Sequence, residues 1–251
     1  PKYLFNEDIR EFNKRQDLPK ELYSLDLLDG SPPCSTFSMA GSREKAWGKS
    51  KQFREGQAMQ TLDDLVFVYC DTIIKLQPKV FILENVKGII QGNAKVYSKN
   101  IVKKMTEAGY EVQVFCLNAA SMGVPQKRER VFFIGHKKEL KFKKLKLGFN
   151  EKSILLKEFG ESEPHNRAKS EKRFGDIILK ELETPNTITT TGDYFYEKDF
   201  FKPTKETIQQ IGTYPLDYDF QTLQPKYLIG MSVPPVMTAQ IANQIYLQWF
   251  K

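Results

Sequence analysis

VFILENV, at residues 80–86, is the stretch that decides the fold: four apolar side chains run without a break into a carboxylate and an amide. Short apolar runs of this kind are typical of strands buried on both faces of a sheet. On the N-terminal side, residues 61–76 repeat apolar side chains at helical spacing, and on the C-terminal side residues 98–108 favour a helix that ends at Gly109. Further strands are predicted at residues 2–5, 25–28, 112–117 and 131–134. This alternation predicts an α/β fold with a mostly parallel sheet.

The sequence changes in character after residue 136. Residues 137–225 are rich in lysine and weakly periodic, with poor helix or strand signals apart from residues 187–191. The last stretch, residues 234–251, has two prolines at its start and favours a helix, with Met237, Ile241, Ile245 and Trp249 on one face. We therefore expect residues 1–136 and 226–251 to form the main domain and residues 137–225 to form a second, smaller one.

The charge balance favours an anionic partner. The formal net charge is +7, from 38 basic and 31 acidic residues, and nucleic acid is the commonest large anionic partner of such chains. Six of the lysines lie in HKKELKFKKLKL, residues 136–147, although a lysine run is as often a solvated face. No stretch of 18 apolar residues and no signal-peptide pattern is visible, so the sequence predicts no contact with a membrane.

Cysteine and histidine are few. The three cysteines, Cys34, Cys70 and Cys116, are scattered and cannot all pair, which indicates a reducing, cytoplasmic setting. With only two histidines, His136 and His165, a zinc cluster is disfavoured.

Polar side chains follow three of the predicted strands at their carboxyl ends. Asp8 follows residues 2–5, Cys34 follows residues 25–28, and Glu84 ends the VFIL run. Ligands of open α/β sheets bind beyond the carboxyl ends of the strands. We therefore expect Asp8, Cys34 and Glu84 to gather at one edge of the sheet and to line a cleft.

Cys34 is a candidate nucleophile because it follows the rigid turn Gly-Ser-Pro-Pro, residues 30–33, which would hold the thiol in a fixed place. The alternative is an ordinary buried cysteine. Glu84 is costly at the end of an apolar strand unless it has a partner or a task, and the alternative is a carboxylate that caps the next loop. Gln126, Arg128 and Arg130 alternate ahead of the strand at 131–134 and so point to one face, either as a functional row or as a surface strip of salt bridges.

Three short stretches of the sequence resemble the motifs of a known family. GSPPCSTFS at residues 30–38, LENV at 83–86 and VPQKRERVFFIG at 124–135 are similar, in order and spacing, to the proline-cysteine, Glu-Asn-Val and Gln-x-Arg-x-Arg motifs of the DNA cytosine-C5 methyltransferases. Weaker similarities extend the match to Asp8-Ile9, Asn118-Ala119-Ala120, Thr187-Ile188 and Gly230-Met231-Ser232-Val233. The resemblance covers most of the chain outside residues 137–180. It implies a Rossmann-like S-adenosylmethionine-dependent methyltransferase sheet with a smaller target-recognition domain.

The resemblance also implies a mechanism. The target cytosine is flipped out of duplex DNA into the active site. The Cys34 thiolate adds to C6 of the base and makes C5 nucleophilic. Glu84 holds N3 and the exocyclic amine, Arg130 holds O2, and Arg128 braces the neighbouring backbone. Loss of the C5 proton then releases Cys34.

The same resemblance assigns the ligand-binding residues. The cofactor is S-adenosylmethionine, with no metal, and its pocket would be lined by Asp8, Ile9, Pro33, Leu65 and Val233. For Leu65, a plain place in the core of a helix is an equal alternative. Contacts to DNA would come from Ser35, Gln126, Thr187 and Ile188. A monomeric enzyme of a bacterium or of a phage-infected cell, acting on double-stranded DNA, is the expected form.

The sequence departs from the family pattern at several places. The Phe-x-Gly-x-Gly loop that wraps the cofactor in other members has no counterpart, and residue 1 is not Met. We expect the sequence to be trimmed at its start; a partner segment that supplies the loop and a degenerate remnant are the alternatives. Met231 stands where the family has Asn, residues 204–215 lack the usual arginine, and the recognition region is short.

Two other functions stay open at this point. A cytosine-C5 methyltransferase that acts on structured RNA such as tRNA would share the chemistry, since one branch of the family does this. A non-catalytic DNA-binding subunit or remnant would share the fold. The second alternative predicts decay at the reacting positions, whereas Cys34, Glu84, Arg128 and Arg130 are all present.

Overall fold

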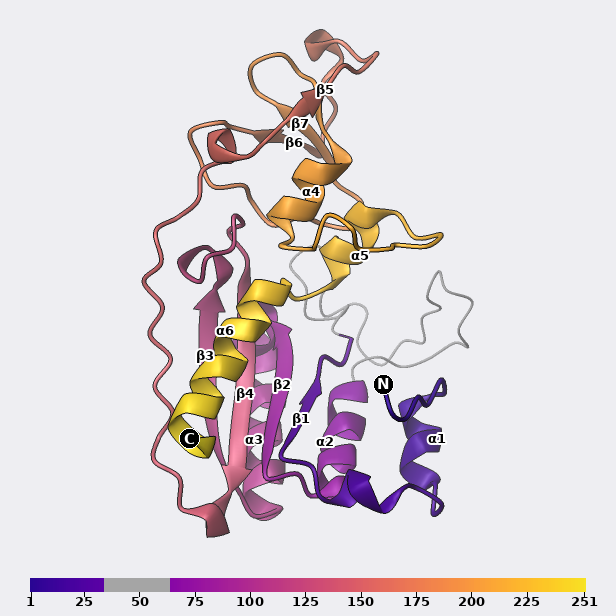
Figure 1. Cartoon of the computed structure of the whole chain (residues 1–251), viewed down its shortest axis with the longest axis vertical. Helices are drawn as coiled ribbons and strands as arrows, with labels where there is room; N and C mark the ends of the chain where they lie inside the picture. Colours follow the sequence, from indigo (N-terminus) through magenta and orange to yellow (C-terminus); the bar gives the residue numbers. More distant parts are fainter. Residues whose placement is uncertain (34–63) are drawn as a thin grey trace. The chain divides into compact units, whose positions relative to one another are not determined.

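The structure, a computed structural model, describes residues 1–33 and 64–251 (Figure 1). The chain divides into two compact units by its internal contacts. The first consists of Pro1–Leu117 and Arg130–Lys144, and the second of Asn118–Glu129 and Leu145–Lys251. Each unit is described by itself below.

A four-stranded sheet is the centre of the first unit. Its strands lie in the order β1 (Leu27–Gly30), β2 (Val80–Val86), β4 (Glu129–Lys137) and β3 (Tyr110–Asn118). β1 runs parallel to β2, whereas β4 runs antiparallel to β2. The side chains of Val80, Phe81, Ile82 and Leu83 are all buried, as the unbroken apolar run predicts for a strand covered on both faces.

Two helices pack on one face of this sheet. α2 (Leu65–Leu76) and α3 (Lys95–Glu107) share a core with alternate residues of β2 and β4, and Phe81 and Leu83 are among those residues. α3 ends where Gly109 adopts a φ of 93°, a left-handed conformation that glycine adopts without strain. The short helix α1 (Ile9–Lys14) contacts α2. Short 3₁₀ turns occupy Lys20–Tyr23, Lys87–Ile90, Gly92–Ala94 and Lys138–Leu140.

Two expectations about the sheet are wrong. Residues 2–5 form no strand; Leu4 is 81% exposed, and the side chains of Lys2 and Tyr3 both donate to Glu21. The sheet is mixed rather than mostly parallel. A parallel placement of consecutive strands needs a crossover of a dozen or more residues, usually a helix. Only the ten residues 119–128 separate β3 from β4, and they hold a single 3₁₀ turn, Ala119–Ser121.

The second unit contains more regular structure than its sequence indicates. Its elements are η7 (Leu156–Glu158), β5 (Ser162–Glu163), η8 (Lys169–Glu171), β6 (Asp176–Leu179), β7 (Asp193–Tyr196), β8 (Lys202–Pro203), α4 (Lys205–Ile211), α5 (Pro225–Met231), α6 (Pro235–Ile245) and η9 (Tyr246–Phe250). β6 pairs with β7 in parallel, and β5 pairs with β8 in antiparallel fashion. Residues 187–191 form neither a helix nor a strand, and an isolated bridge between Asn186 and Lys127 precedes them.

The C-terminal helix confirms its prediction. α6 begins with a proline in its first turn and continues into η9, and Met237, Ile241, Ile245 and Trp249 are all buried. Across residues 1–33 and 64–251, no helix combines the length and the apolar character that a membrane crossing requires.

Gly135 gives a first test of the sheet core. A Cβ atom at this position would overlap the ring of Phe81, which faces it across β2 and β4. Overpacking of this kind costs about 1–3 kcal/mol. Gly135→Ala should lower the free energy of unfolding in urea by that amount. Gly148→Ala is the matched control, since its Cβ would have no atom within 4 Å; equal effects of the two substitutions would contradict the packing described here.

Candidate active site

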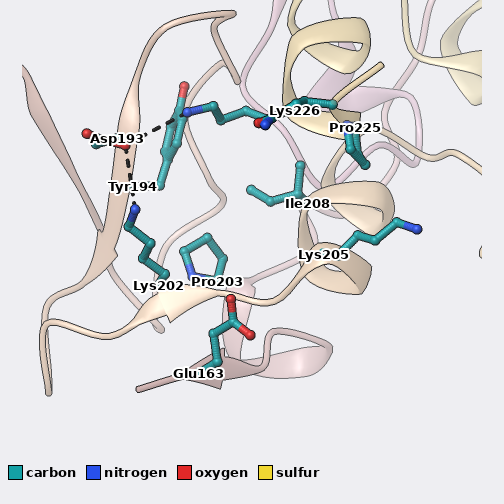
Figure 2. Close-up of a pocket in the computed structure, with 10 residues that line it drawn as sticks. Glu163, Asp193, Tyr194, Lys202, Pro203, Lys205, Ile208, Pro225 and Lys226 are labelled. Carbon is teal, nitrogen blue, oxygen red and sulfur yellow. Dashed lines mark ion pairs between the residues drawn. The ribbon is translucent and has the colours of Figure 1, made fainter. Parts of the chain in front are cut away.

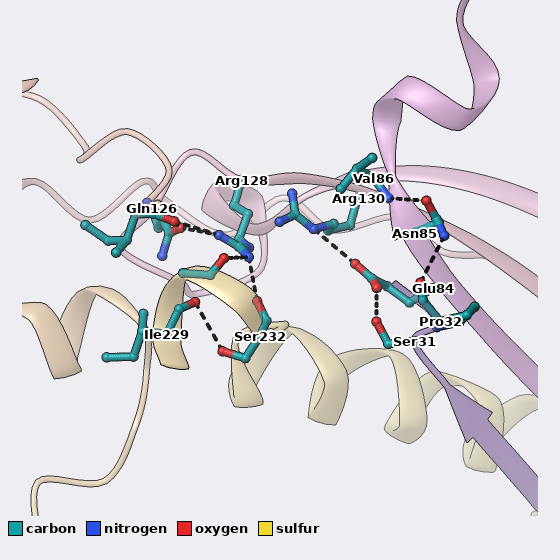
Figure 3. A network of polar contacts seen from close by, with 12 residues as sticks. Ser31, Pro32, Glu84, Asn85, Val86, Gln126, Arg128, Arg130, Ile229 and Ser232 are labelled. Atoms are coloured by element: carbon teal, nitrogen blue, oxygen red, sulfur yellow. Dashed lines mark hydrogen bonds and ion pairs between the residues drawn. The ribbon is translucent and has the colours of Figure 1, made fainter. Parts of the chain in front are cut away.

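Glu84 lies at the centre of a buried polar cluster in the first unit (Figure 3). Its Oε1 atom is 3.0 Å from Nε of Arg130, and its Oε2 atom accepts a hydrogen bond from the Ser31 hydroxyl. Both side chains of the ion pair are mostly buried, with 9% of Glu84 and 14% of Arg130 exposed. A carboxylate withdrawn from water is tolerated when it is paired and hydrogen-bonded, and both conditions are met here.

The register of the sheet brings this pair together. β2 and β4 are antiparallel, with Val86 opposite Arg130 and Glu84 opposite Phe132. Glu84 and Arg130 therefore occupy positions diagonal to each other across two neighbouring strands, which long side chains can span.

The turn ahead of Cys34 is fastened to the same strand. Asn85, the residue after Glu84, donates from Nδ2 to the carbonyl of Pro32 at 3.4 Å and accepts from the backbone N–H of Val86 at 3.0 Å. The strand that leads into the turn ends at Gly30, where a Cβ would overlap the Tyr69 ring. Asn85 thus has a structural role that the LENV motif alone does not reveal.

A second carboxylate adds to the negative charge at this end of the sheet. Desolvation, and after it the charge of Glu84, raise the pKa of Asp29 above its ordinary value. Two carboxylates and one guanidinium suit a ligand edge that offers hydrogen-bond donors, such as an amine beside a protonated ring nitrogen.

Arg128 lies in the second unit and belongs to a different network (Figure 3). It is completely buried. Its Nη1 atom donates to the carbonyl of Ile188 at 3.1 Å, and its Nη2 atom donates to the carbonyls of Gly230 and Ser232 at 2.9 and 2.6 Å. Gln126, also fully buried, accepts from Nη1 at 3.3 Å. The expected row of Gln126, Arg128 and Arg130 on one face is therefore split between two networks.

The residues expected to contact DNA differ in accessibility. Ser35 lies outside the described residues, as does the expected nucleophile Cys34. Gln126 and Ile188 have no exposed surface, so in this structure their side chains support the protein rather than meet a ligand. Thr187 is half-buried, and its hydroxyl donates to the carbonyl of Lys127 at 2.7 Å.

Three of the expected cofactor residues of the first unit, Asp8, Ile9 and Leu65, lie at α1 and at the start of α2. Asp8 is the N-cap of α1 and accepts from the backbone N–H of Arg10. The guanidinium of Arg10 contacts Asp8 at 3.5 Å and Asp64 at 2.9 Å, so it joins the cap of α1 to the residue before Leu65. Because no strand precedes Asp8, the expectation that a strand end carries it to the sheet edge is wrong.

These residues fit an adenosine group by their chemistry. Asp8 is an exposed carboxylate, Ile9 next to it is apolar and half-buried, and Pro33 is exposed. An amine-bearing aromatic ring needs an acceptor of this kind and apolar neighbours. Leu65 is only 6% exposed and packs in the helix core, the alternative noted above. Val233 belongs to the second unit and is half-buried between α5 and α6.

The lysine-rich segment does not begin near Glu84. β4 starts opposite the carboxyl end of β2 and finishes with His136 paired to Val80, at the other end of that strand. The lysines from residue 137 onward thus continue from the sheet end that is remote from Glu84. Net charge alone gives no hint of this placement.

The second unit also contains a pocket of about 240 Å³ that the sequence did not indicate (Figure 2). In it, Lys202 and Lys226 each lie 3.9 Å from Asp193. It is lined by Glu163, Asp193, Tyr194, Lys202, Pro203, Lys205, Ile208, Gln224, Pro225 and Lys226. None of these residues belongs to a motif, so no sequence signal could have singled them out. Within residues 1–33 and 64–251, no group of three or more His, Cys, Asp or Glu residues could hold a metal ion.

Comparisons with known proteins agree with this arrangement. The fold is that of solved methyltransferases. One, from an E. coli prophage and described as a DNA modification methyltransferase, has a TM-score of 0.69 at 17% identity, covering 98% of this chain and 86% of that one. Another, a variant of DNMT2 from Spodoptera frugiperda, has a TM-score of 0.66 at 14% identity, covering 96% of this chain and 85% of that one.

The family follows from the sequence match. The model of the family described as C-5 cytosine-specific DNA methylase matches residues 3–211, and the chain belongs to this family. The Type II methyltransferase M.FnuDI of Fusobacterium nucleatum is 36% identical over 141 residues, which are 55% of this chain and 35% of that protein. M.MthTI of Methanothermobacter thermautotrophicus is 30% identical over 179 residues, 70% of this chain and 49% of that protein. The chain thus spans between about a third and a half of these relatives.

The two cysteines outside the proline turn should differ in reactivity. Burial raises the pKa of Cys70 to about 12, whereas Cys116 is exposed on β3. Because the thiolate is the reactive form, iodoacetamide at pH 8 should alkylate Cys116 and leave Cys70 intact until the protein is unfolded. Peptide mass spectrometry measures both sites, and rapid labelling of Cys70 in the native protein would contradict its burial.

Proposed function

We propose that the protein transfers a methyl group from S-adenosylmethionine to C5 of a cytosine in duplex DNA, through a covalent bond between Cys34 and C6 of the base. The observation that carries the proposal is the buried pair of Glu84 and Arg130 beside the turn that leads to Cys34. Membership of the C-5 cytosine-specific DNA methylase family supports it.

Glu84 would bind the edge of the flipped base that carries N3 and the exocyclic amine. Its two oxygens now accept from Arg130 and Ser31, so donors from the base can take over or join these contacts. When the Cys34 sulfur bonds to C6, electron density moves toward N3, and a proton held there by Glu84 stabilises the adduct.

Arg130 and Cys34 would complete the contacts to the base. The Glu84 carboxylate orients the Arg130 guanidinium, which would donate a hydrogen bond to O2 of the base. Once C5 has taken the methyl group, with the sulfonium leaving as a neutral thioether, a water molecule would accept the proton from C5. The C5–C6 double bond would form again as the Cys34 thiolate leaves. Cys34 is thereby regenerated, and 5-methylcytosine is released.

S-adenosylmethionine, when bound, supplies a methyl group on a positively charged sulfur. Asp8, Ile9, Pro33 and Val233 would hold it. The burial of Leu65 favours the alternative that this side chain belongs to the core of a helix. No metal takes part in this proposal.

We assign residues 1–136 and 226–251 to the catalytic domain and residues 137–225 to target recognition. This division by function differs from the two compact units, which join the C-terminal helix to the recognition residues. We further propose that the enzyme acts as a monomer in the cytoplasm of a bacterium or a phage-infected cell.

A covalent trap tests the nucleophile. The intact protein that contains residues 1–251 is incubated with S-adenosylmethionine and duplex DNA carrying 5-fluorocytosine. Fluorine at C5 cannot leave as a proton does, so a denaturation-resistant adduct should accumulate. Cys34→Ala should abolish the adduct and methyl transfer while DNA binding persists.

Cys116→Ala is the control for the trap, because this cysteine is exposed but has no role in the proposal. It should form the adduct like the unchanged protein. An adduct in the Cys34→Ala variant would contradict the mechanism. An adduct with RNA in place of DNA would show that the substrate is RNA.

Substitution of Glu84 tests proton placement at N3. Glu84→Gln keeps the size of the side chain but removes the negative charge that pairs with Arg130. The single-turnover rate at saturating DNA and cofactor should fall about 10²-fold or more, the range for a lost proton-transfer group. Quenched-flow measurement of product gives this rate, and an unchanged value would remove Glu84 from the chemistry.

A further inference from the structure

Arg128 joins two segments of the second unit that are far apart in sequence. One side of its guanidinium donates to the carbonyl of Ile188, and the other side donates to the carbonyls of Gly230 and Ser232. Ile188 follows Thr187, which the family resemblance implies contacts DNA, and Ser232 precedes Val233, which is proposed to contact the cofactor. A single planar group therefore bonds to the backbone of both segments.

Gln126 strengthens the first of these connections. Its Oε1 atom accepts from the backbone N–H of Ile188 at 3.1 Å and also from Arg128, while its Nε2 atom donates to the carbonyl of Ile211 at 3.0 Å. The N–H and the carbonyl of Ile188 are thus both held by buried side chains from residues 126–128.

Close packing supports the second connection. A Cβ atom at Gly230 would lie 2.6 Å from the backbone N of Thr190 and 2.7 Å from the carbonyl carbon of Thr189. The backbone after Ile188 therefore lies directly against the backbone at Gly230, with no room for a side chain between them. This contact is independent of the hydrogen bonds of Arg128.

Burial makes these contacts hard to break separately. Arg128 and Gln126 have no exposed surface, so water cannot replace a hydrogen bond that is lost. A buried donor left unsatisfied costs about 1–3 kcal/mol, and more for a charged group. A shift of the segment at Ile188 that is not matched at Gly230 and Ser232 would therefore be disfavoured.

We propose that Arg128 is a positioning residue that couples DNA binding to cofactor binding. This inference rests on the proposed function for the role of Val233 and on the DNA contact that the family resemblance implies for Thr187. A shift of the Thr187 segment on DNA binding is transmitted through the Arg128 guanidinium to the turn at Gly230–Ser232. By linkage, the cofactor tightens DNA binding by the same factor.

Arg128→Lys tests the coupling, because a lysine ammonium is a compact point donor and cannot reproduce the two-sided planar contacts. The dissociation constant of S-adenosylhomocysteine is measured with and without an unmethylated duplex that the unchanged protein methylates. DNA should tighten this binding about tenfold in the unchanged protein and less than twofold in the variant. The dissociation constant of DNA is measured in turn with and without S-adenosylhomocysteine. For each protein, this ratio should equal the factor by which DNA tightens S-adenosylhomocysteine binding.

Two further variants keep the test sharp. Lys127→Ala changes a half-exposed neighbour between Gln126 and Arg128 and should retain the full coupling factor. Gln126→Met keeps a side chain of similar size but removes the hydrogen bonds of the Gln126 amide to Ile188 and Arg128. It should therefore lower the coupling factor even if Arg128→Lys fails to fold.

The outcomes separate this inference from the proposed function. A coupling factor near one in the unchanged protein, or an unchanged factor in both Arg128→Lys and Gln126→Met, overturns the coupling while methylation persists. The coupling is also overturned if Arg128→Lys keeps the full coupling factor but lowers the maximal rate of methyl transfer as far as Glu84→Gln does. Arg128 would then take part in the chemistry directly. Absence of methyl transfer by the unchanged protein refutes the proposed function instead.

Discussion

The ion pair of Glu84 and Arg130 is the constraint on which the site depends. A carboxylate at the end of an otherwise apolar strand costs free energy unless a partner reaches it. The antiparallel register of β2 and β4 supplies that partner from a neighbouring strand. A shift of one residue would turn every side chain of β4 to the opposite face and leave Glu84 without Arg130. The mixed sheet is therefore a condition for the site.

Neighbouring arginines in one motif serve different purposes in this chain. Arg130 pairs with the Glu84 carboxylate, and 14% of its side chain is exposed. Arg128 is fully buried and donates to backbone carbonyls and a glutamine. The buried charge of Arg128 is solvated by carbonyl dipoles, and this arrangement holds a backbone shape rather than an exposed surface. The Gln-x-Arg-x-Arg motif of this chain therefore contains residues that hold the backbone in place as well as a residue of the proposed active site.

The sequence was informative where side-chain periodicity is strong. The central strands and α2, α3 and α6 were predicted because apolar runs and helical spacing reflect burial directly. Residues 2–5 mimic a strand but have no neighbouring strand, and β5 and β8 have two residues each, too few to show a period. The burial of Gln126 and Arg128 could not be predicted either, since polar side chains are usually exposed and the backbone groups of Ile188 that they bond lie 60 or more residues away.

The position of the lysine-rich segment limits what net charge can explain. The excess of basic residues suggested nucleic acid, but the run begins at the end of β4 that is remote from Glu84. Lysines in that position would raise the rate of encounter with a polyanion through their field, which falls off over about 10 Å at moderate salt. Selection of one cytosine instead requires directed contacts of short range. Among the described residues, the Glu84 carboxylate is already bonded to Arg130 and Ser31, so its placement for such contacts depends on these two partners.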